Sequence, residues 1–220
     1  MGKRMSLADI DHFYGRQSEL GLLRKRVIDL KEGYRQNVAL IGRRFIGKTS
    51  IVQKVMVDLD DPEIVPVYLD LDSKSFDYFF ENFVGSLLYH YCRTHGMPLY
   101  EEVSVLLESI HPCLPQTYKA VKRIQSFLAH EKLAEAYREI ITLPQVFTRE
   151  ASLFCVLVLD EFHQLEGIGI PEVFQELGKV IMTQKKCLYV VVSSCPSLAE
   201  RILSERLSLL FGNFEVLRID

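Results

Sequence analysis

The stretch VALIGRRFIGKTS, which spans residues 38–50, decides how the rest of the chain is interpreted. Its first four residues are apolar and predict a buried strand. The next eight residues fit the pattern G-x-x-x-x-G-K-[ST], and apolar residues then recur at helical spacing over 51–59. The positions that the pattern fixes are Gly42, Gly47, Lys48 and Thr49. A strand, a basic turn framed by glycines and a helix are therefore predicted in succession, as a phosphate-binding loop requires.

The residue types in this turn suit a polyphosphate chain. Glycine lets backbone amides approach phosphate oxygens, and the start of the following helix carries partial positive charge. We expect Lys48 to contact the β- and γ-phosphates and the Thr49 hydroxyl to bind Mg²⁺. An ordinary glycine turn with a surface lysine is the alternative, which the flanking strand and helix disfavour. The expected nucleotide-binding residues of the loop are Gly42, Arg43, Arg44, Phe45, Ile46, Gly47, Lys48, Thr49 and Ser50.

The composition is that of an ordinary globular protein. Of 220 residues, 48% are hydrophobic and 25% are charged, which allows a single domain spanning 1–220 with a sizeable core. The net charge of −3 argues against a generally basic surface that coats nucleic acid. The longest apolar run, 153–159, is far shorter than the ~20 residues of a membrane span. Five cysteines without paired spacing favour a reducing compartment, so we expect a cytoplasmic protein with no membrane partner.

Strand-like and helix-like segments alternate, which is typical of an α/β fold with a mainly parallel sheet. The expected strands are 38–41, 64–71, 154–159, 188–192 and 214–219. The expected helices are 18–31, 51–59, 76–91, 100–110, 116–128, 132–141, 172–183 and 197–210. Ser18 is the expected cap of the first helix, and Pro144 is expected to break the helical pattern before it. Segment 76–150 is predicted to be a helical insertion within the single domain.

An acidic pair, Asp160-Glu161, follows the apolar segment 154–159. Because the carboxyl ends of parallel strands form the ligand-binding edge of such a sheet, we expect both side chains beside the phosphate-binding loop. Asp160 suits the Walker B role of holding Mg²⁺ directly or through water. Glu161 suits a general base that polarises the attacking water. A simple turn is the alternative for the pair alone, but its combination with the loop favours hydrolysis.

Polar residues also end the segment 188–192, at Ser193-Ser194. If this strand lies beside 38–41, a hydroxyl there faces the γ-phosphate and orients water. A serine pair that only begins a loop is an equal alternative. We take Ser193, Glu161 and Lys48 as the catalytic candidates.

Three further side chains are weaker candidates. His163 lies two residues beyond the acidic pair and could sense the nucleotide, although a lone histidine is more often incidental. Arg201 and Arg206 follow on an amphipathic segment, where either could complete the site of a neighbouring subunit as an arginine finger. A surface arginine on a helix is the commoner case.

Several of these segments together resemble a known family. Residues 13–20, FYGRQSEL, look like the F-x-G-R-x-x-E-L opening of AAA+-like and STAND-type ATPases. GRRFIGKTSIV, VPVYLDL, VLVLDEFHQL and VVVSSCPSLAERILSERLSLLFG then follow in the order of the archaeal-type P-loop ATPase family, of the ASCE class. The resemblance covers most of the chain and is weakest across 76–150.

This resemblance implies a P-loop NTPase fold of the RecA/AAA+-like kind. It is a three-layer sandwich with a five-stranded, mainly parallel sheet, the phosphate-loop strand in the centre and the Walker B strand nearby. The resemblance also implies that the F-x-G-R segment lines the adenine, although its aromatic residues could equally staple the first helix. The candidate residues there are Phe13, Tyr14, Gly15 and Arg16.

The family implies a slow ATP-hydrolysing module that uses ATP and Mg²⁺ as a switch or motor core, with a protein partner or self-association. Relatives usually carry a glycine and an arginine where this chain has Gly212-Asn213, and a helical lid after the last strand. We therefore expect an ATPase core without its C-terminal lid. A non-hydrolysing nucleotide-binding scaffold is one alternative. The other is the core of a DNA-processing factor that contacts nucleic acid through missing regions.

Overall fold

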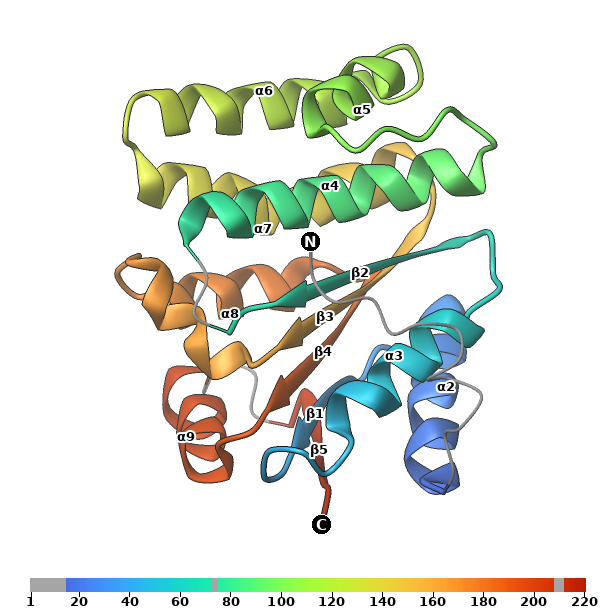
Figure 1. Ribbon diagram of the computed structural model, residues 1–220, viewed down its shortest axis with the longest axis vertical. Helices are drawn as coiled ribbons and strands as arrows, with labels where there is room; N and C mark the ends of the chain where they lie inside the picture. The colour runs from blue at the N-terminus through green and yellow to red at the C-terminus, as the bar shows by residue number, and fades with distance from the viewer. Residues whose placement is uncertain (1–14, 73–74, 208–211) are drawn as a thin grey trace.

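The computed structural model describes residues 15–72, 75–207 and 212–220, so the candidates Phe13 and Tyr14 lie outside the described residues (Figure 1). The strands are β1 (Asn37–Ile41), β2 (Ile64–Asp70), β3 (Phe154–Asp160), β4 (Cys187–Ser193) and β5 (Phe214–Arg218). The helices are α2 (Gln17–Lys31), α3 (Lys48–Asp58), α4 (Phe76–Thr94), α5 (Val103–Ile110), α6 (Pro115–Ala129), α7 (Leu133–Glu150), α8 (Val173–Thr183) and α9 (Pro196–Arg201). A 3₁₀-helix, η1 (Phe162–Ile168), and a π-helical turn, η2 (Ile202–Arg206), complete the described elements.

All five strands are parallel and lie in the order β2-β3-β4-β1-β5. The α/β class and the five-stranded sheet are thus confirmed. The expectation that the phosphate-loop strand β1 is the central strand is wrong. The middle strand is β4, because β2 and β3 lie on one side of it and β1 and β5 lie on the other. β1 lies between β4 and β5, and Ile41 at its end is in register with Ser193. The two strands are therefore adjacent, which is the condition on which the expected role of the Ser193 hydroxyl depends.

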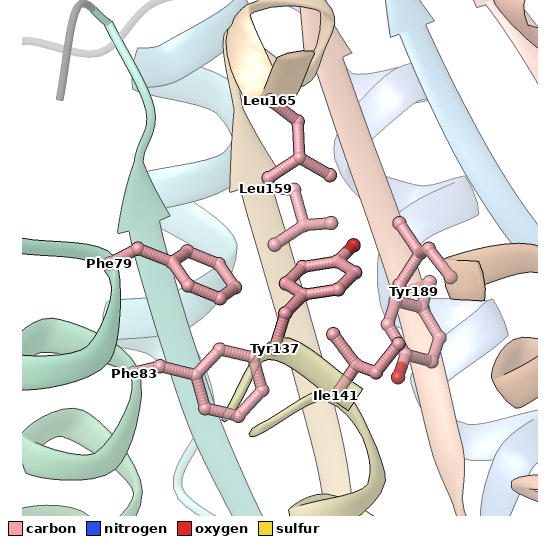
Figure 2. A pocket seen from close by; sticks show the side chains of 8 residues that line it. Phe79, Phe83, Tyr137, Ile141, Leu159, Leu165 and Tyr189 are labelled. Carbon is pink, nitrogen blue, oxygen red and sulfur yellow. The ribbon is translucent and has the colours of Figure 1, made fainter. Parts of the chain in front are cut away.

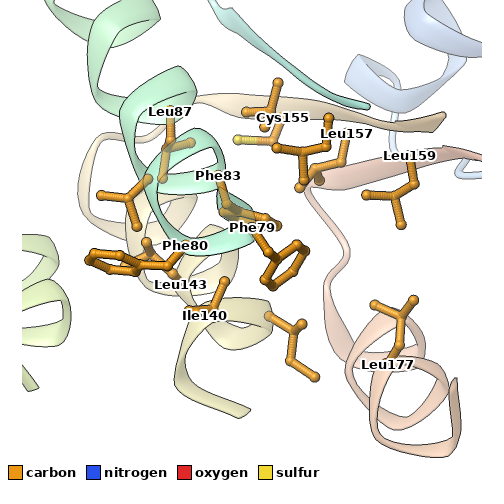
Figure 3. Packing of buried hydrophobic residues seen from close by; sticks show 14 of the residues in the cluster. Phe79, Phe80, Phe83, Leu87, Ile140, Leu143, Cys155, Leu157, Leu159 and Leu177 are labelled. Carbon is orange, nitrogen blue, oxygen red and sulfur yellow. The ribbon is translucent and has the colours of Figure 1, made fainter. Parts of the chain in front are cut away.

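Helices cover both faces of the sheet (Figure 1). Successive strand residues point to opposite faces, so α2 and α3 pack on Val38, Val158 and their neighbours. On the other face lie α4, α7 and α8, where Phe79 and Phe83 of α4 face Leu157 and its neighbours in β3 (Figure 3). Burial on both faces explains why β3 and β4 are almost continuously apolar.

Segment 76–150 is helical, as predicted, and forms α4 to α7. α4 and α7 pack on the sheet, whereas α5 and α6 form an outer layer beyond them (Figure 1). The Ser75 hydroxyl caps α4 by accepting the Tyr78 N–H at 3.2 Å. That the segment is an insertion within one domain stays a prediction. Across 15–72, 75–207 and 212–220, no helix combines the length and apolar character that a membrane crossing needs.

The predicted helix break at Pro144 is wrong, because this residue lies inside α7. Proline removes one backbone donor and usually kinks or breaks a helix. Here Pro144 is buried, and its neighbours Leu143 and Phe147 are fully enclosed by the core. Burial of side chains of this size contributes about 1.5–3 kcal/mol each, which offsets the loss of a hydrogen bond.

Candidate functional site

The two glycines shape the turn that joins β1 to α3. A Cβ atom on Gly42 would lie 2.3 Å from the Ile219 carbonyl oxygen and 2.5 Å from Ile46 Cδ1, so only glycine fits there. Gly47 precedes α3 with a φ of 93°, which glycine adopts without strain. The Gly42 N–H donates to the Ser193 carbonyl at 3.2 Å and ties the turn to β4. The first amides of α3 have no intrahelical acceptor, so they are available to an anion.

The middle of the turn faces outward. Arg43, Arg44 and Phe45 are exposed. Phe45 is fully exposed at 101% and has a φ of 64°, a left-handed conformation that is unusual for a bulky residue. Arg44 pairs with Asp72 at 3.4 Å, an exposed contact worth little free energy.

Lys48 begins α3 with its side chain turned back into the loop. The residue is only 5% exposed, and its ammonium donates to the Arg43 carbonyl at 2.6 Å. Burial lowers the pKa of this ammonium, while the negative charges of Glu161 and Asp160 oppose the shift. Ser50 is half-buried in the first turn of the same helix.

Asp160, at the end of β3, contacts the first turn of α3. Its Oδ2 accepts the Thr49 hydroxyl at 2.8 Å and the Tyr68 hydroxyl at 2.7 Å. Its Oδ1 accepts the Glu161 N–H at 2.9 Å. Burial raises the pKa of the carboxyl, and the two hydroxyl donors hold that rise back. The structure therefore brings together the two motifs that the sequence analysis paired.

Tyr68 is a site residue that the sequence analysis missed. It comes from β2, two residues before the position in register with Asp160, and points to the same face of the sheet. Burial and the nearby Asp160 carboxylate raise the pKa of its hydroxyl, so the hydroxyl stays protonated and donates. A polar-tipped aromatic in a strand that is apolar up to its last residue, Asp70, is the only signal that the sequence offers.

Glu161 leaves the strand in a left-handed conformation with a φ of 51°. Its Oε2 accepts the Ser194 N–H at 2.9 Å and lies 3.4 Å from His163 Nδ1. The Ser193 hydroxyl oxygen lies 2.9 Å from that same nitrogen. Burial lowers the pKa of His163, although the Glu161 carboxylate opposes the shift, so the ring is neutral near pH 7. Glu161 and Ser193 are thus neighbours, joined by a histidine that the sequence analysis ranked low.

Arg16 lies at the same edge of the sheet as the loop. Its Nη2 donates to the Asp220 carbonyl at 2.5 Å. Asp220 directly follows Ile219, whose carbonyl lies against Gly42. The predicted cap at Ser18 is wrong, because α2 begins at Gln17 with Arg16 at the cap position. The Ser18 hydroxyl instead donates to Glu19 at 2.6 Å. Gly15 is exposed, with a φ of 83°.

Several basic side chains outside the loop form ion pairs. Arg24 pairs with Asp58 at 2.5 Å, and Arg26 pairs with Asp29 and Glu215 at 2.9 and 2.8 Å. Arg206 lies 4.0 Å from Glu166, and Arg201 is exposed at the end of α9. Nothing in the described contacts brings either of these last two arginines to the phosphate-binding loop.

A small cavity lies elsewhere, in the core beneath α4 and α7 (Figure 2). Its lining is apolar apart from two tyrosine hydroxyls, and both of these form hydrogen bonds with residues that do not line the cavity. Tyr137 donates to the Val173 carbonyl at 3.0 Å, and Tyr189 donates to Gln184 at 2.6 Å. With no charged lining residue, this cavity does not suit a nucleotide. Its lining residues are Phe79, Phe83, Tyr137, Ile141, Leu159, Leu165, Leu177 and Tyr189.

Solved structures of other proteins match the fold of the chain. No protein-family model matches it, and no curated protein is significantly similar to it. The ORC1 protein of Aeropyrum pernix, solved in complex with DNA, is 15% identical over 96% of this chain and 46% of its own, with a TM-score of 0.57. The ADP form of Aeropyrum pernix ORC2 is 14% identical over 96% and 51%, with a TM-score of 0.53. A Walker-type ATPase of Pyrococcus abyssi is 14% identical over 94% and 54%, with a TM-score of 0.50.

Likenesses at this identity show the fold alone. The chain has the fold of these three structures, one of which is a Walker-type ATPase, and this agrees with the P-loop fold that the resemblance implied. It spans about half the length of the structures it matches, which are covered to 46%, 51% and 54%.

Proposed function

We propose that the chain binds ATP with Mg²⁺ and hydrolyses it slowly, as a nucleotide-dependent switch or motor core. One observation carries the proposal. The Thr49 hydroxyl and the Asp160 carboxylate are 111 residues apart in sequence and 2.8 Å apart in space. A hydroxyl of this loop and an acid from a neighbouring strand are the ligands that Mg²⁺ takes beside a triphosphate. The shared fold of the Walker-type ATPase supports a nucleotide as the ligand.

The residues around this contact fit both groups. Lys48 uses one of its three N–H donors on the Arg43 carbonyl, which leaves donors for the β- and γ-phosphates. Thr49 and Asp160 would hold Mg²⁺, which supplies charge neutralisation on the phosphates. Glu161 would accept a proton from the attacking water, and the Ser193 hydroxyl would orient that water. The buried Lys48 ammonium would stabilise the negative charge that grows on the phosphates during the reaction.

Phosphate release from the wild-type chain and from Glu161→Gln tests the hydrolase proposal. We expect the variant to bind ATP as the wild type does and to release phosphate about 10²–10⁴-fold more slowly, the range of general-base contributions. Lys48→Met, which keeps the length of the stem but removes the charge, should fail to bind ATP. Equal phosphate release by the wild type and Glu161→Gln would reject hydrolysis by this site.

A nucleotide-binding scaffold without hydrolysis is the second candidate. It is favoured by the position of Glu161, whose Oε2 accepts the Ser194 N–H at 2.9 Å and faces β4. A carboxylate held there serves as a base only if the water lies on the same side. ATP binding by the wild type without any phosphate release above that of Lys48→Met would favour this second function.

The partner and the cellular location are also proposals. A protein partner or self-association would suit a switch with low intrinsic turnover. The matched ORC1 protein was solved in complex with DNA, which motivates the alternative of a DNA-processing factor. Salt-dependent binding of a fluorescent duplex by the chain itself would support a nucleic-acid partner. The five free thiols fit a cytoplasmic location.

A further inference from the structure

His163 lies between Glu161 and Ser193, the two side chains that are proposed to activate and orient the attacking water. Its Nδ1 is 2.9 Å from Ser193 Oγ and 3.4 Å from Glu161 Oε2. The histidine side chain is 8% exposed and the glutamate side chain 16%, so water competes little for these contacts. The ring is carried by η1, the 3₁₀-helix that begins directly after Glu161. One imidazole nitrogen therefore faces both groups at once.

The hydrogens of this cluster can be assigned by counting donors. Ser193 Oγ already accepts the Cys195 N–H at 3.1 Å, and its own hydrogen can reach the Cys195 carbonyl at 3.3 Å. A neutral histidine carries one N–H, and the Glu161 carboxylate beside Nδ1 favours that hydrogen on Nδ1. The Nδ1–H then donates toward Ser193 Oγ and the Glu161 carboxylate. With the hydrogen on Nε2 instead, the Nδ1 lone pair would face that carboxylate.

We propose that His163 is a positioning residue, which fixes the orientations of Glu161 and Ser193 for the attack of water. This inference rests on the proposed ATP hydrolysis. Among the described contacts, His163 touches these two side chains and Gln164, and not the Lys48, Thr49 or Asp160 side chains. Its loss should therefore lower kcat and leave the binding of ATP and Mg²⁺ unchanged.

Three substitutions separate positioning from simple structural support. His163→Asn places a polar atom near the position of Nδ1, whereas His163→Gln places one near Nε2. His163→Ala removes both. We expect kcat to fall about 10–100-fold in the alanine and glutamine variants, since small misplacements have effects of that size. The asparagine variant should keep kcat within about threefold of wild type, and KM should stay within about twofold throughout.

Matched controls accompany these rates. His130→Ala removes an exposed histidine, at the end of α6, that bonds only its own helix within the described contacts. It should change neither kcat nor KM. Thermal unfolding of every variant, with and without MgATP, reports whether the fold and the nucleotide site persist. ¹⁵N chemical shifts of the wild-type ring should report hydrogen on Nδ1, and Glu161→Gln should shift this signal.

The outcomes distinguish the inference from the function on which it rests. Wild-type kcat in His163→Ala, with Glu161→Gln inactive, would overturn the role of His163 and leave the ATPase intact. Equal losses in the asparagine and alanine variants, in step with lost thermal stability, would overturn positioning in favour of packing. If the wild type releases no phosphate, the proposed hydrolysis and this role both fall, while the ring's ¹⁵N shifts still report whether the bridge forms.

Discussion

The contact between Thr49 and Asp160 can be tested by its free energy, without any nucleotide. Thr49→Val keeps the shape of the side chain and removes the hydroxyl that donates to Asp160 Oδ2 at 2.8 Å. The carboxylate is 4% exposed and accepts two other donors, from Tyr68 and the Glu161 backbone. Loss of a hydrogen bond to a buried charged group costs about 1.5–3 kcal/mol. Thr49→Val should therefore lower the free energy of unfolding by about that much at pH 7.

A double-mutant cycle with Asp160→Asn isolates the pair. In the Asp160→Asn background the acceptor is neutral, so Thr49→Val should cost only about 0.5–1.5 kcal/mol there. We therefore expect a coupling free energy of about 1 kcal/mol or more between the two positions. Urea unfolding followed by far-UV circular dichroism is the suitable assay, because the chain has no tryptophan. Costs that agree within about 0.3–0.5 kcal/mol in both backgrounds would show that the charge of Asp160 contributes nothing to the contact.

The pH dependence of this cost has a definite sign. Burial raises the pKa of Asp160 in the folded state above its unfolded value of about 3.9. The free energy of unfolding therefore falls as pH rises through the folded pKa and the carboxyl ionises. The Thr49 hydroxyl makes this fall smaller, because it donates a hydrogen bond to the ionised carboxylate. Thr49→Val should destabilise the protein more at pH 7 than at pH 4. An equal cost at the two pH values would mean that the hydroxyl does not stabilise the charged form.

Three further predictions concern the glycines, the lysine and the metal. Gly42→Ala should lower the free energy of unfolding by about 1–3 kcal/mol, because its Cβ would overlap Ile219 and Ile46. Gly21→Ala should instead raise the free energy of unfolding by about 0.5–1 kcal/mol, because this helical glycine in α2 has open space around it. Urea unfolding measures both changes. Lys48→Met should abolish the rise in thermal midpoint that ATP gives the wild type, as differential scanning fluorimetry would report. Chelation of Mg²⁺ should stop phosphate release, and manganese should restore it, since both cations accept oxygen ligands; release that continues in excess chelator would contradict the metal assignment.

Residues that carry a fixed spacing could be predicted from the sequence. Gly42, Gly47 and Lys48 belong to a pattern whose geometry depends on residues next to one another in the chain, and the structure has the expected turn. Asp160 could be placed because every strand of a parallel sheet ends at the same edge. The first inference uses only residues that are adjacent in sequence, and the second uses one general rule of α/β folds. Neither requires knowledge of which distant segments pair with each other.

Residues whose role depends on distant partners could not be predicted. Tyr68 reaches Asp160 only because β2 pairs with β3 in one particular register. His163 acquires partners only because η1 folds back over the end of β4, after the left-handed Glu161. The position of β1 next to the middle strand likewise depends on which strands pair. Pro144 stays helical because burial of α7 in the core outweighs the tendency of proline to break a helix. Each of these depends on tertiary contacts that periodicity does not encode.

The site also carries a stability cost that distinguishes it from a structural ion pair. Burial lowers the pKa of Lys48 and raises that of Asp160, so the fold disfavours the charged form at both positions. A structural pair would satisfy each charge with the other, yet Lys48 donates to a backbone carbonyl and Asp160 accepts from hydroxyls. A polyphosphate at Lys48 and a divalent cation at Asp160 would relieve both penalties, and ligand binding would then stabilise the fold by linkage. A neutral side chain at either position should therefore make the ligand-free protein no less stable while removing its response to MgATP, because natural sites commonly give up stability for binding.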